Sequence, residues 1–195
     1  MNVYVVYCHP APESYVAALR DRAVGALQRA GHEVRVSDLY AEGFDPVLSA
    51  WEKANHLAPP ETKPAIAEHA GNLLWCNALV LIYPTWWSGQ PAMLKGWIDR
   101  VWVRGIAYDL PPDSSVIQPR LQHIKQVVAI TTHGSTKLIN AIQGECGKRV
   151  ITRSLRVLCN RWARARWLAM YGLDHAGQRR RERFLERVDR VMTRL

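Results

Sequence analysis

The sequence contains no apolar run as long as the roughly 18 residues that a membrane-spanning helix requires. Cysteine is also scarce, and none of the four cysteines falls in a Cys-x-x-Cys pair. This spacing argues against a zinc cage or a dense disulfide framework, so we expect no metal and four buried, reduced thiols: Cys8, Cys76, Cys146 and Cys159. Met1 to Val6 lead directly into an apolar segment without the basic flank of an export signal, which predicts a cytoplasmic protein.

Short strand-like segments alternate with amphipathic helical segments along the chain. Strand character marks residues 3–7, 33–39, 78–83, 126–131 and 167–171. Helical periodicity marks residues 13–30, the segment that begins at Pro91, and residues 177–195. Parallel strands need crossovers of this length, because each connection must return the chain to the same edge of the sheet. The pattern therefore predicts one α/β domain, residues 1–195, in which helices cover both faces of a doubly wound, five-stranded parallel sheet.

Two further expectations concern the parts of the chain between the strands. The helix that begins at Pro91 is expected to bury the face that carries Trp97 and to turn Arg100 toward solvent. Residues 40–64 and 105–123 are rich in proline and acidic residues and are too long to be simple connections. Stretches of this kind usually cover a site or a partner in α/β proteins.

The loop after the first strand is the first candidate for ligand binding, because open α/β sheets bind ligands beyond the carboxyl ends of their strands. It has no Gly-x-Gly-x-x-Gly, which argues against a nicotinamide-type Rossmann turn. It offers the His9 imidazole, the Ser14 hydroxyl and the free amides of a helix N-terminus, a combination that binds phosphate. The simpler interpretation stays open: Ser14 only caps the helix, and His9 packs against the loop.

Two later loops also carry unusual residues at strand ends. Trp86 and Trp87 follow the third strand, and adjacent tryptophans are costly to leave exposed. They indicate either a flat aromatic ligand or packing in the core or at a dimer interface. After the fourth strand, residues 131–135 place hydroxyls, an imidazole and a glycine together. This loop suits hydrogen bonding to an electron-rich ring edge, or it forms a turn that satisfies itself.

Taken in order, these segments resemble the NAD(P)H:quinone oxidoreductases of the flavodoxin-like superfamily, the family of DT-diaphorase, modulator of drug activity B and the potassium-efflux ancillary oxidoreductases. The resemblance rests on His9-Pro10 with Ser14, Asp38-Leu39-Tyr40 with Phe44-Asp45-Pro46, Pro84 to Trp102 with Gly105-Ile106-Ala107-Tyr108, and Thr131-Thr132. Residues 91–101 are its most specific part. It implies a flavodoxin-like fold that binds a flavin, either FMN or FAD.

The resemblance also implies a role for each loop. The flavin phosphate would be held by His9, Ser14, Tyr15 and Val16. The flavin ring would be lined by Pro84, Thr85, Trp86 and Trp87. Its pyrimidine edge would be approached by Thr131, Thr132, His133 and Gly134. Family members are typically homodimers with the flavin near the interface, and they pass hydride from NAD(P)H to a quinone that stacks on the ring.

One feature of the family is missing here. In the quinone reductases a Tyr and His pair downstream of the Thr-Thr motif assists the transfer, but residues 137–147 contain neither residue type. Those roles are therefore not carried over. His133, directly after the Thr-Thr pair, is our own candidate for catalysis, because it can supply a hydrogen bond or a positive charge to the reduced ring.

Three functions are consistent with the resemblance. The first is an NAD(P)H dehydrogenase that acts on quinones, or on azo and nitro aromatics. The second is a flavin-binding regulatory subunit of a potassium efflux antiporter, since some relatives of this size are ancillary proteins. A one-electron carrier of the flavodoxin type is the third, and the basic net charge argues against it. The choice between NADH and NADPH stays open.

The basic charge is concentrated at the end of the chain. Residues 1–144 hold 12 basic and 12 acidic side chains, whereas residues 145–195 hold 14 basic and 5 acidic ones. A solvated helix face is the simplest explanation. Attraction of anionic NADPH, an acidic partner protein and peripheral association with anionic lipid are the alternatives. No nucleic-acid-binding motif accompanies the charge, so we expect no nucleic-acid partner.

Overall fold

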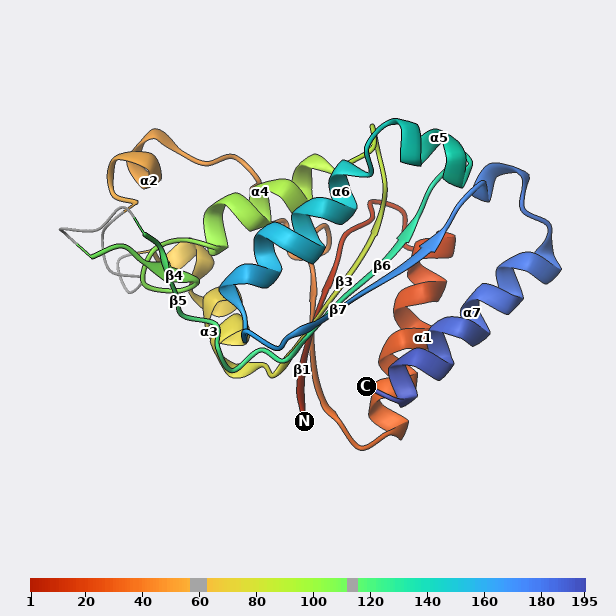
Figure 1. The fold of residues 1–195 in the computed structure, drawn as a ribbon, viewed down its shortest axis with the longest axis horizontal. Helices are drawn as coiled ribbons and strands as arrows, with labels where there is room; N and C mark the ends of the chain where they lie inside the picture. Colours follow the sequence, from red (N-terminus) through yellow and green to blue (C-terminus); the bar gives the residue numbers. More distant parts are fainter. Residues whose placement is uncertain (57–62, 112–115) are drawn as a thin grey trace.

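The computed structural model describes residues 1–56, 63–111 and 116–195, and its centre is a five-stranded parallel sheet (Figure 1). The strands are β1 (Asn2–Tyr7), β2 (Glu33–Asp38), β3 (Ala78–Pro84), β6 (Gln126–Thr132) and β7 (Arg164–Met170). They lie in the order β2-β1-β3-β6-β7, and all neighbouring pairs are parallel. The chain moves outward in one direction from β1 to β2 and in the other direction from β3 onward, which confirms the predicted doubly wound sheet.

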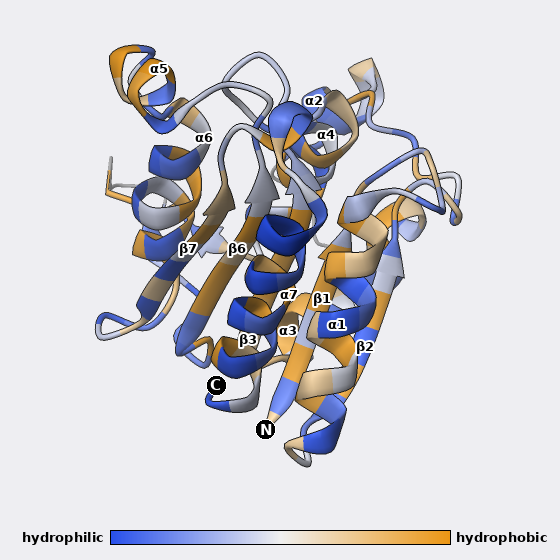
Figure 2. Ribbon diagram, turned by 90° about the vertical axis from the view of Figure 1, so that its right-hand side faces the viewer, coloured by the Kyte–Doolittle hydropathy of each residue, from blue (hydrophilic) through white to orange (hydrophobic). Residues whose placement is uncertain are grey.

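Helices cover both faces of the sheet. On one face, α1 (Tyr15–Arg29) and α7 (Gln178–Thr193) pack side by side (Figure 1). The other face carries α3 (Ala67–Trp75), α4 (Ala92–Val101), α6 (Cys146–Arg149) and the helical turns η3 (Val150–Leu155) and η4 (Arg156–Leu158). Two apolar cores result, because successive side chains of a strand point to opposite faces. Figure 2 shows hydrophobic strands in the centre and a hydrophilic outer surface on α7.

Shorter elements complete the two long stretches and the loops. They are α2 (Ala50–Ala54), η2 (Pro64–Ile66), α5 (Lys137–Ile142), η5 (Leu173–His175) and the antiparallel pair β4 (Tyr108–Asp109) and β5 (Gln118–Pro119). Residues 57–62 and 112–115 of the long stretches lie outside the described residues. Residues 44–52 of the first stretch contact α4. The expectation that these stretches cover a site or a partner stays a prediction.

The contact between this segment and α4 corrects one expectation. Arg100 does not face solvent: it is 6% exposed, forms an ion pair with Glu52 at 2.8 Å and lies over the Phe44 ring. Helical spacing marked its face of α4 as polar, but a segment distant in the sequence covers that face. Gly96 lies at the closest approach, where an added Cβ would overlap Pro46.

The cysteines are free, and three of the four are buried as expected. Burial raises the pKa of Cys8, Cys76 and Cys159 to about 12, so their thiols stay protonated and unreactive at neutral pH. Cys146 is the exception, because it begins the short helix α6 on the surface and is exposed. The expectation of four buried thiols is therefore wrong for this one.

In the described part of the chain, no helix combines the length and the apolar character that crossing a membrane would take. The same residues contain no group of three or more His, Cys, Asp or Glu side chains placed to hold a metal ion.

Candidate functional site

A cavity of about 680 Å³ opens at the carboxyl edge of the sheet, where the loops after β1, β3, β6 and β7 meet. Ten of the residues predicted from the sequence line it: His9, Ser14, Tyr15, Val16, Pro84, Thr85, Trp86, Trp87, Thr132 and Gly134. Leu173 and Asp174 also line it and were missed. They follow the carboxyl end of β7, so the rule that directed attention to the other loops applies to them as well.

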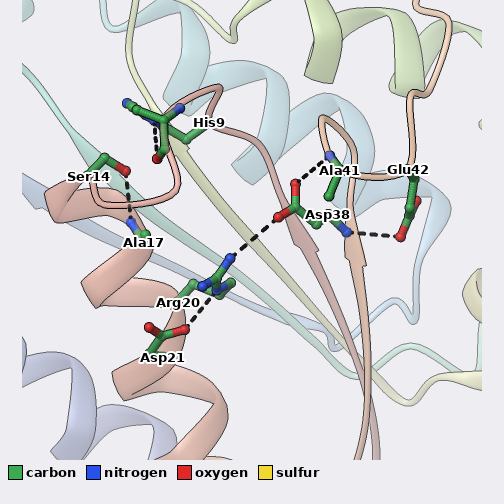
Figure 3. Close-up of polar contacts among 9 residues, drawn as sticks. His9, Ser14, Ala17, Arg20, Asp21, Asp38, Ala41 and Glu42 are labelled. Carbon is green, nitrogen blue, oxygen red and sulfur yellow. Dashed lines mark hydrogen bonds and ion pairs between the residues drawn. The ribbon is translucent and has the colours of Figure 1, made fainter.

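One end of the cavity is the N-terminus of α1. Ser14 is the helix cap, and its hydroxyl oxygen accepts a hydrogen bond from the Ala17 amide at 3.1 Å (Figure 3). The amides of Tyr15 and Val16 have no carbonyl partner within the helix, as is usual for a first turn. Capping and phosphate binding are thus compatible, because the cap uses one amide and leaves its neighbours directed at the cavity.

The loop before α1 is held in place by local contacts. The Ala11 amide donates to Nδ1 of His9 at 3.0 Å, which fastens this imidazole to its own loop while it still lines the cavity. Farther along α1, Arg20 forms an ion pair with Asp38 at 3.4 Å at the end of β2 (Figure 3). The Ala41 amide donates to the same carboxylate at 3.2 Å. These contacts attach the start of α1 to the neighbouring strand end.

The opposite wall is a tight turn that projects two tryptophans. Trp86 and Gly89 exchange backbone hydrogen bonds at 3.2 and 3.1 Å. Within the turn, Trp87 and Ser88 have φ values of 47° and 61°, a left-handed conformation that bulky residues rarely adopt. Trp87 is fully exposed and Trp86 is 43% exposed, so neither packs in the core. Packing in the core is therefore excluded for this pair. Stacking on a flat ligand and packing at a dimer interface remain.

The floor of the cavity is built from hydroxyls at the ends of β3 and β6. The Thr85 and Thr131 hydroxyl oxygens lie 2.8 Å apart, and the Thr85 amide donates to the Thr132 carbonyl at 2.8 Å. Thr131 is fully buried behind Thr85 and does not itself line the cavity. Thr131 instead contacts the Thr85 side chain, which does line the cavity.

His133 borders a separate hollow of about 200 Å³ rather than the main cavity. The two adjoin, because Thr85, Trp87 and Gly134 line both. His133 is 6% exposed, and burial lowers its pKa, although a hydrogen bond with Asn140 and the charge of Glu145 oppose that shift. Its imidazole is therefore neutral at neutral pH.

Comparison with known proteins agrees with this architecture. The family model described as "Flavodoxin-like fold" matches residues 1–191. The chain is 33% identical over 159 residues to "NAD(P)H dehydrogenase [quinone] 1" of Cavia porcellus, which covers 72% of this chain and 57% of that protein. It thus spans little more than half the length of this curated relative.

Two solved structures match along almost the whole chain. One is Smu.1420 from Streptococcus mutans UA159, with a TM-score of 0.86, 28% identity and 100% of both chains covered. The other is an NAD(P)H:quinone oxidoreductase from Methanothermobacter marburgensis, with a TM-score of 0.79 and 27% identity, covering 99% of this chain and 96% of that one. The match over residues 1–191, with the strand order and the cavity at the carboxyl edge, means that this chain belongs to the flavodoxin-like fold family.

Proposed function

We propose that this protein is a flavin-dependent oxidoreductase that transfers hydride from NAD(P)H to quinones or related aromatic acceptors. One observation carries the proposal: a single cavity joins a helix N-terminus with free amides to a wall of two exposed tryptophans. The first feature suits a phosphate and the second a planar ring, and a flavin nucleotide contains both. The relatives named as quinone reductases support the same reaction.

The lining of the cavity fits FMN or FAD, and its volume of about 680 Å³ lies in the range of cofactor sites. We assign the phosphate to Ser14, Tyr15 and Val16, with His9 beside it. We assign the ring to Pro84, Thr85, Trp86 and Trp87, and its pyrimidine edge to Thr132 and Gly134. Thr131 would orient the Thr85 hydroxyl from behind.

When bound, the flavin supplies the acceptance and donation of hydride. The protein needs only to hold it, to stack the donor and acceptor in turn, and to accommodate the negative charge that reduction brings to the site. The Thr85 and Thr132 side chains and the neighbouring backbone amides are suited to that last task. Metal ligands have no part in this proposal.

A second copy of the chain is the partner we propose for the apolar surface beside the cavity. The helix α5 carries three exposed apolar residues (Leu138, Ile139 and Ile142), and its end lies beside the turn that carries Trp87, because Ser88 donates a hydrogen bond to Gln143 at 2.7 Å. We call Trp87 and these three residues the rim surface. Apolar side chains gathered beside a site are typical of a protein interface. The resemblance to the quinone oxidoreductases, which are typically homodimers with the flavin near the interface, supports the same assignment.

The dimer is tested by sedimentation of the purified protein. Ile142→Asp at the rim surface is expected to convert dimer to monomer. Trp162→Asp is the matched control, because Trp162 is 75% exposed but precedes the amino end of β7, at the opposite edge of the sheet. A monomeric wild type, or a variant that stays dimeric, would contradict the proposed interface.

The reaction itself is tested on the purified protein. The bound cofactor is released and identified by mass, and anaerobic bleaching of the flavin absorbance is followed after addition of NADPH or NADH. Rapid bleaching that menadione reverses would support the oxidoreductase and identify the cofactor. A flavin that stays oxidised would point to the ancillary antiporter subunit, and failure to bind flavin after reconstitution would refute both.

We also propose that residues 1–195 act as one flavin-binding unit in the cytoplasm, the compartment that maintains the NAD(P)H pool. The arginines of α7 line a hollow of about 390 Å³ against β7, with Arg180, Arg183 and Arg187 on its rim. Attraction of the anionic nicotinamide donor is the role that we propose for them.

A further inference from the structure

The buried imidazole of His133 has a defined orientation that holding a cofactor does not require. Its Nδ1 lies 2.7 Å from the Oδ1 atom of Asn140, a residue of α5 that is itself only 3% exposed. Its Nε2 faces the other way, 3.4 Å from the Thr85 hydroxyl at the floor of the main cavity. One ring nitrogen is thus directed into the protein and the other toward the site.

Asn140 determines which nitrogen carries the proton of the neutral ring. The Asn140 amide nitrogen donates to the Ser135 hydroxyl and to the Thr136 carbonyl, both at 2.8 Å. Its two protons are therefore used, and its oxygen must be the atom that faces His133. Because that oxygen only accepts, Nδ1 of His133 must donate. The neutral imidazole accordingly keeps its proton on Nδ1 and presents a lone pair at Nε2.

Tyr171, the residue directly after β7, holds the face of the ring. Its aromatic ring stacks on His133 with centroids 4.5 Å apart and an interplanar angle of 23°. Tyr171 is in turn anchored at its hydroxyl, which donates to Glu145 at 3.1 Å and accepts from the Trp167 indole at 3.3 Å. An aromatic face stabilises an imidazolium more than a neutral imidazole.

The charges around His133 act in opposite directions. Glu145 is ionised, because its hydrogen bond with Lys148 holds its pKa below the ordinary value, and its negative charge favours a protonated His133. Lys148 of α6 and Lys137 of α5 partly offset that charge. Asp174 of η5 approaches the neighbouring Gly134, and the loop after β3 contributes the uncharged Thr85, Trp87 and Ser88 to the hollow that His133 borders. Burial keeps the ring neutral until negative charge enters the site.

We propose that His133 is the proton-holding residue of the site, that it gains and loses its second proton at Nε2, and that Asn140 and Tyr171 are its positioning residues. The inference rests on the proposed function. Reduction of a quinone by NAD(P)H consumes one proton: the hydride, which carries the electron pair of the broken C–H bond, forms one O–H bond of the product, and this proton forms the other. Nε2–H of His133 supplies that proton, and water restores it.

The first test reads the ring directly and needs no turnover. Long-range ¹H–¹⁵N NMR of labelled protein is expected to show a pyrrole-type Nδ1 and a pyridine-type Nε2 at His133 above its pKa. Asn140→Leu is expected to release this preference and give a mixture of tautomers. A wild-type ring protonated at Nε2, or a variant with an unchanged tautomer, would overturn the inference even in an active enzyme.

The second test separates the ring face of Tyr171 from its hydroxyl. Tyr171→Leu removes both and is expected to lower the pKa of His133 in an NMR titration. Tyr171→Phe keeps the stacked face and is expected to retain most of the wild-type pKa. Equal titration curves for wild type and Tyr171→Leu would remove Tyr171 from the proposal.

The third test is the pH profile of turnover at saturating NAD(P)H and menadione. His133→Gln keeps a polar side chain and is expected to lose the limb of the profile that follows the His133 titration, while its affinity for the flavin changes little. An identical profile in this variant would contradict the proton-holding role. A wild type without turnover would refute the proposed function instead, and the NMR result would still stand by itself.

Discussion

The protein buries two imidazoles among similar side chains: His133 beside the proposed site and His69 in a network of core side chains. His69 of α3 lies 3.1 Å from the Tyr4 hydroxyl, with Glu42 3.7 Å from its other nitrogen. His133 likewise has a tyrosine, a hydroxyl and a carboxylate nearby. Burial lowers the pKa of both rings. The residue types and the burial are therefore not what distinguishes them.

The two histidines differ in whether they border a space that a ligand can enter. His69 lies edge-on to the core residue Phe44, with ring centroids 4.9 Å apart. His133 borders a hollow that adjoins the main cavity at Thr85. A proton-transferring group must reach the reacting molecule directly or through one water. A perturbed pKa therefore identifies a candidate for proton transfer only when the titrating group also faces a space that a ligand can enter.

The largest expected effect is on turnover. His133→Ala should lower kcat with NAD(P)H and menadione by on the order of 100-fold, the usual contribution of a positioned acid or base. Steady-state kinetics at a fixed, saturating flavin concentration measures this. His69→Ala serves as the control and should keep kcat within about twofold per folded molecule, since a core residue lends nothing to the transition state. Equal losses of kcat in both variants would contradict the proposed difference between His133 and His69.

The next largest expected effect is on stability, at the contact between α4 and the segment that covers it. Gly96→Ala should destabilise the protein by about 2 kcal/mol, because its Cβ would overlap Pro46 in the segment that covers α4. Gly71→Ala in α3 is the matched control, since nothing lies within 4 Å of its added Cβ. That variant should be stabilised by up to about 1 kcal/mol through helix propensity. Urea unfolding of both proteins checks the pair, and a loss in Gly71→Ala similar to that in Gly96→Ala would contradict the steric argument.

His69→Ala should itself reduce the free energy of unfolding by about 1–2 kcal/mol, because it leaves the buried Tyr4 and Ser37 hydroxyls with fewer partners. Urea unfolding at neutral pH gives the value. His175→Ala, at an exposed position in η5, should change stability by less than about 0.5 kcal/mol. If His69→Ala were equally neutral, the core network would contribute nothing to stability.

The lowered pKa values of the two buried histidines, His69 and His133, contribute to the pH dependence of stability. The unfolded chain binds protons at histidine as pH falls through about 6.5, whereas the folded protein resists protonation of His69 and His133. The stability linked to these groups is therefore present above about pH 6.5 and is lost as pH falls toward the folded-state pKa values. Between about pH 7.5 and pH 5.5 the wild type should lose more unfolding free energy than His69→Ala. Parallel losses would show that His69 is not linked to folding.

The smallest expected effect concerns the charged side of the molecule. Arg183→Glu with Arg187→Glu should lower kcat/KM for NADPH by about threefold at low salt, and added salt should remove the difference. Both side chains line the hollow beside β7, which Tyr171 also lines. Arg22→Glu, an exposed position on α1, is the control and should change this rate less. No salt dependence would favour the simpler interpretation of a solvated arginine face.

Much of the site was predictable because strand ends can be recognised in the sequence. Apolar runs marked each central strand, and the loops after them hold His9, Ser14, Trp86 and Trp87, which line the cavity. Some lining residues, such as Val16, came from the family resemblance instead. The reasoning from strand ends failed for Leu173 and Asp174, because the fifth strand was predicted to run through Tyr171 and its following loop was not considered. It also misplaced Arg100, since helical spacing describes one helix and not the segment that packs on it.

The sequence by itself determined the order of strands and helices along the chain, the helix cap at Ser14 and the location of the excess charge, because these depend on neighbours within a few residues. Only the tertiary structure decided that Asn140, Tyr171 and Glu145 gather around His133. They come from α5, the end of β7 and the loop before α6, and their contacts span up to 38 residues of sequence. Such contacts exist only when the sheet brings β6 and β7 side by side, and no local pattern records them.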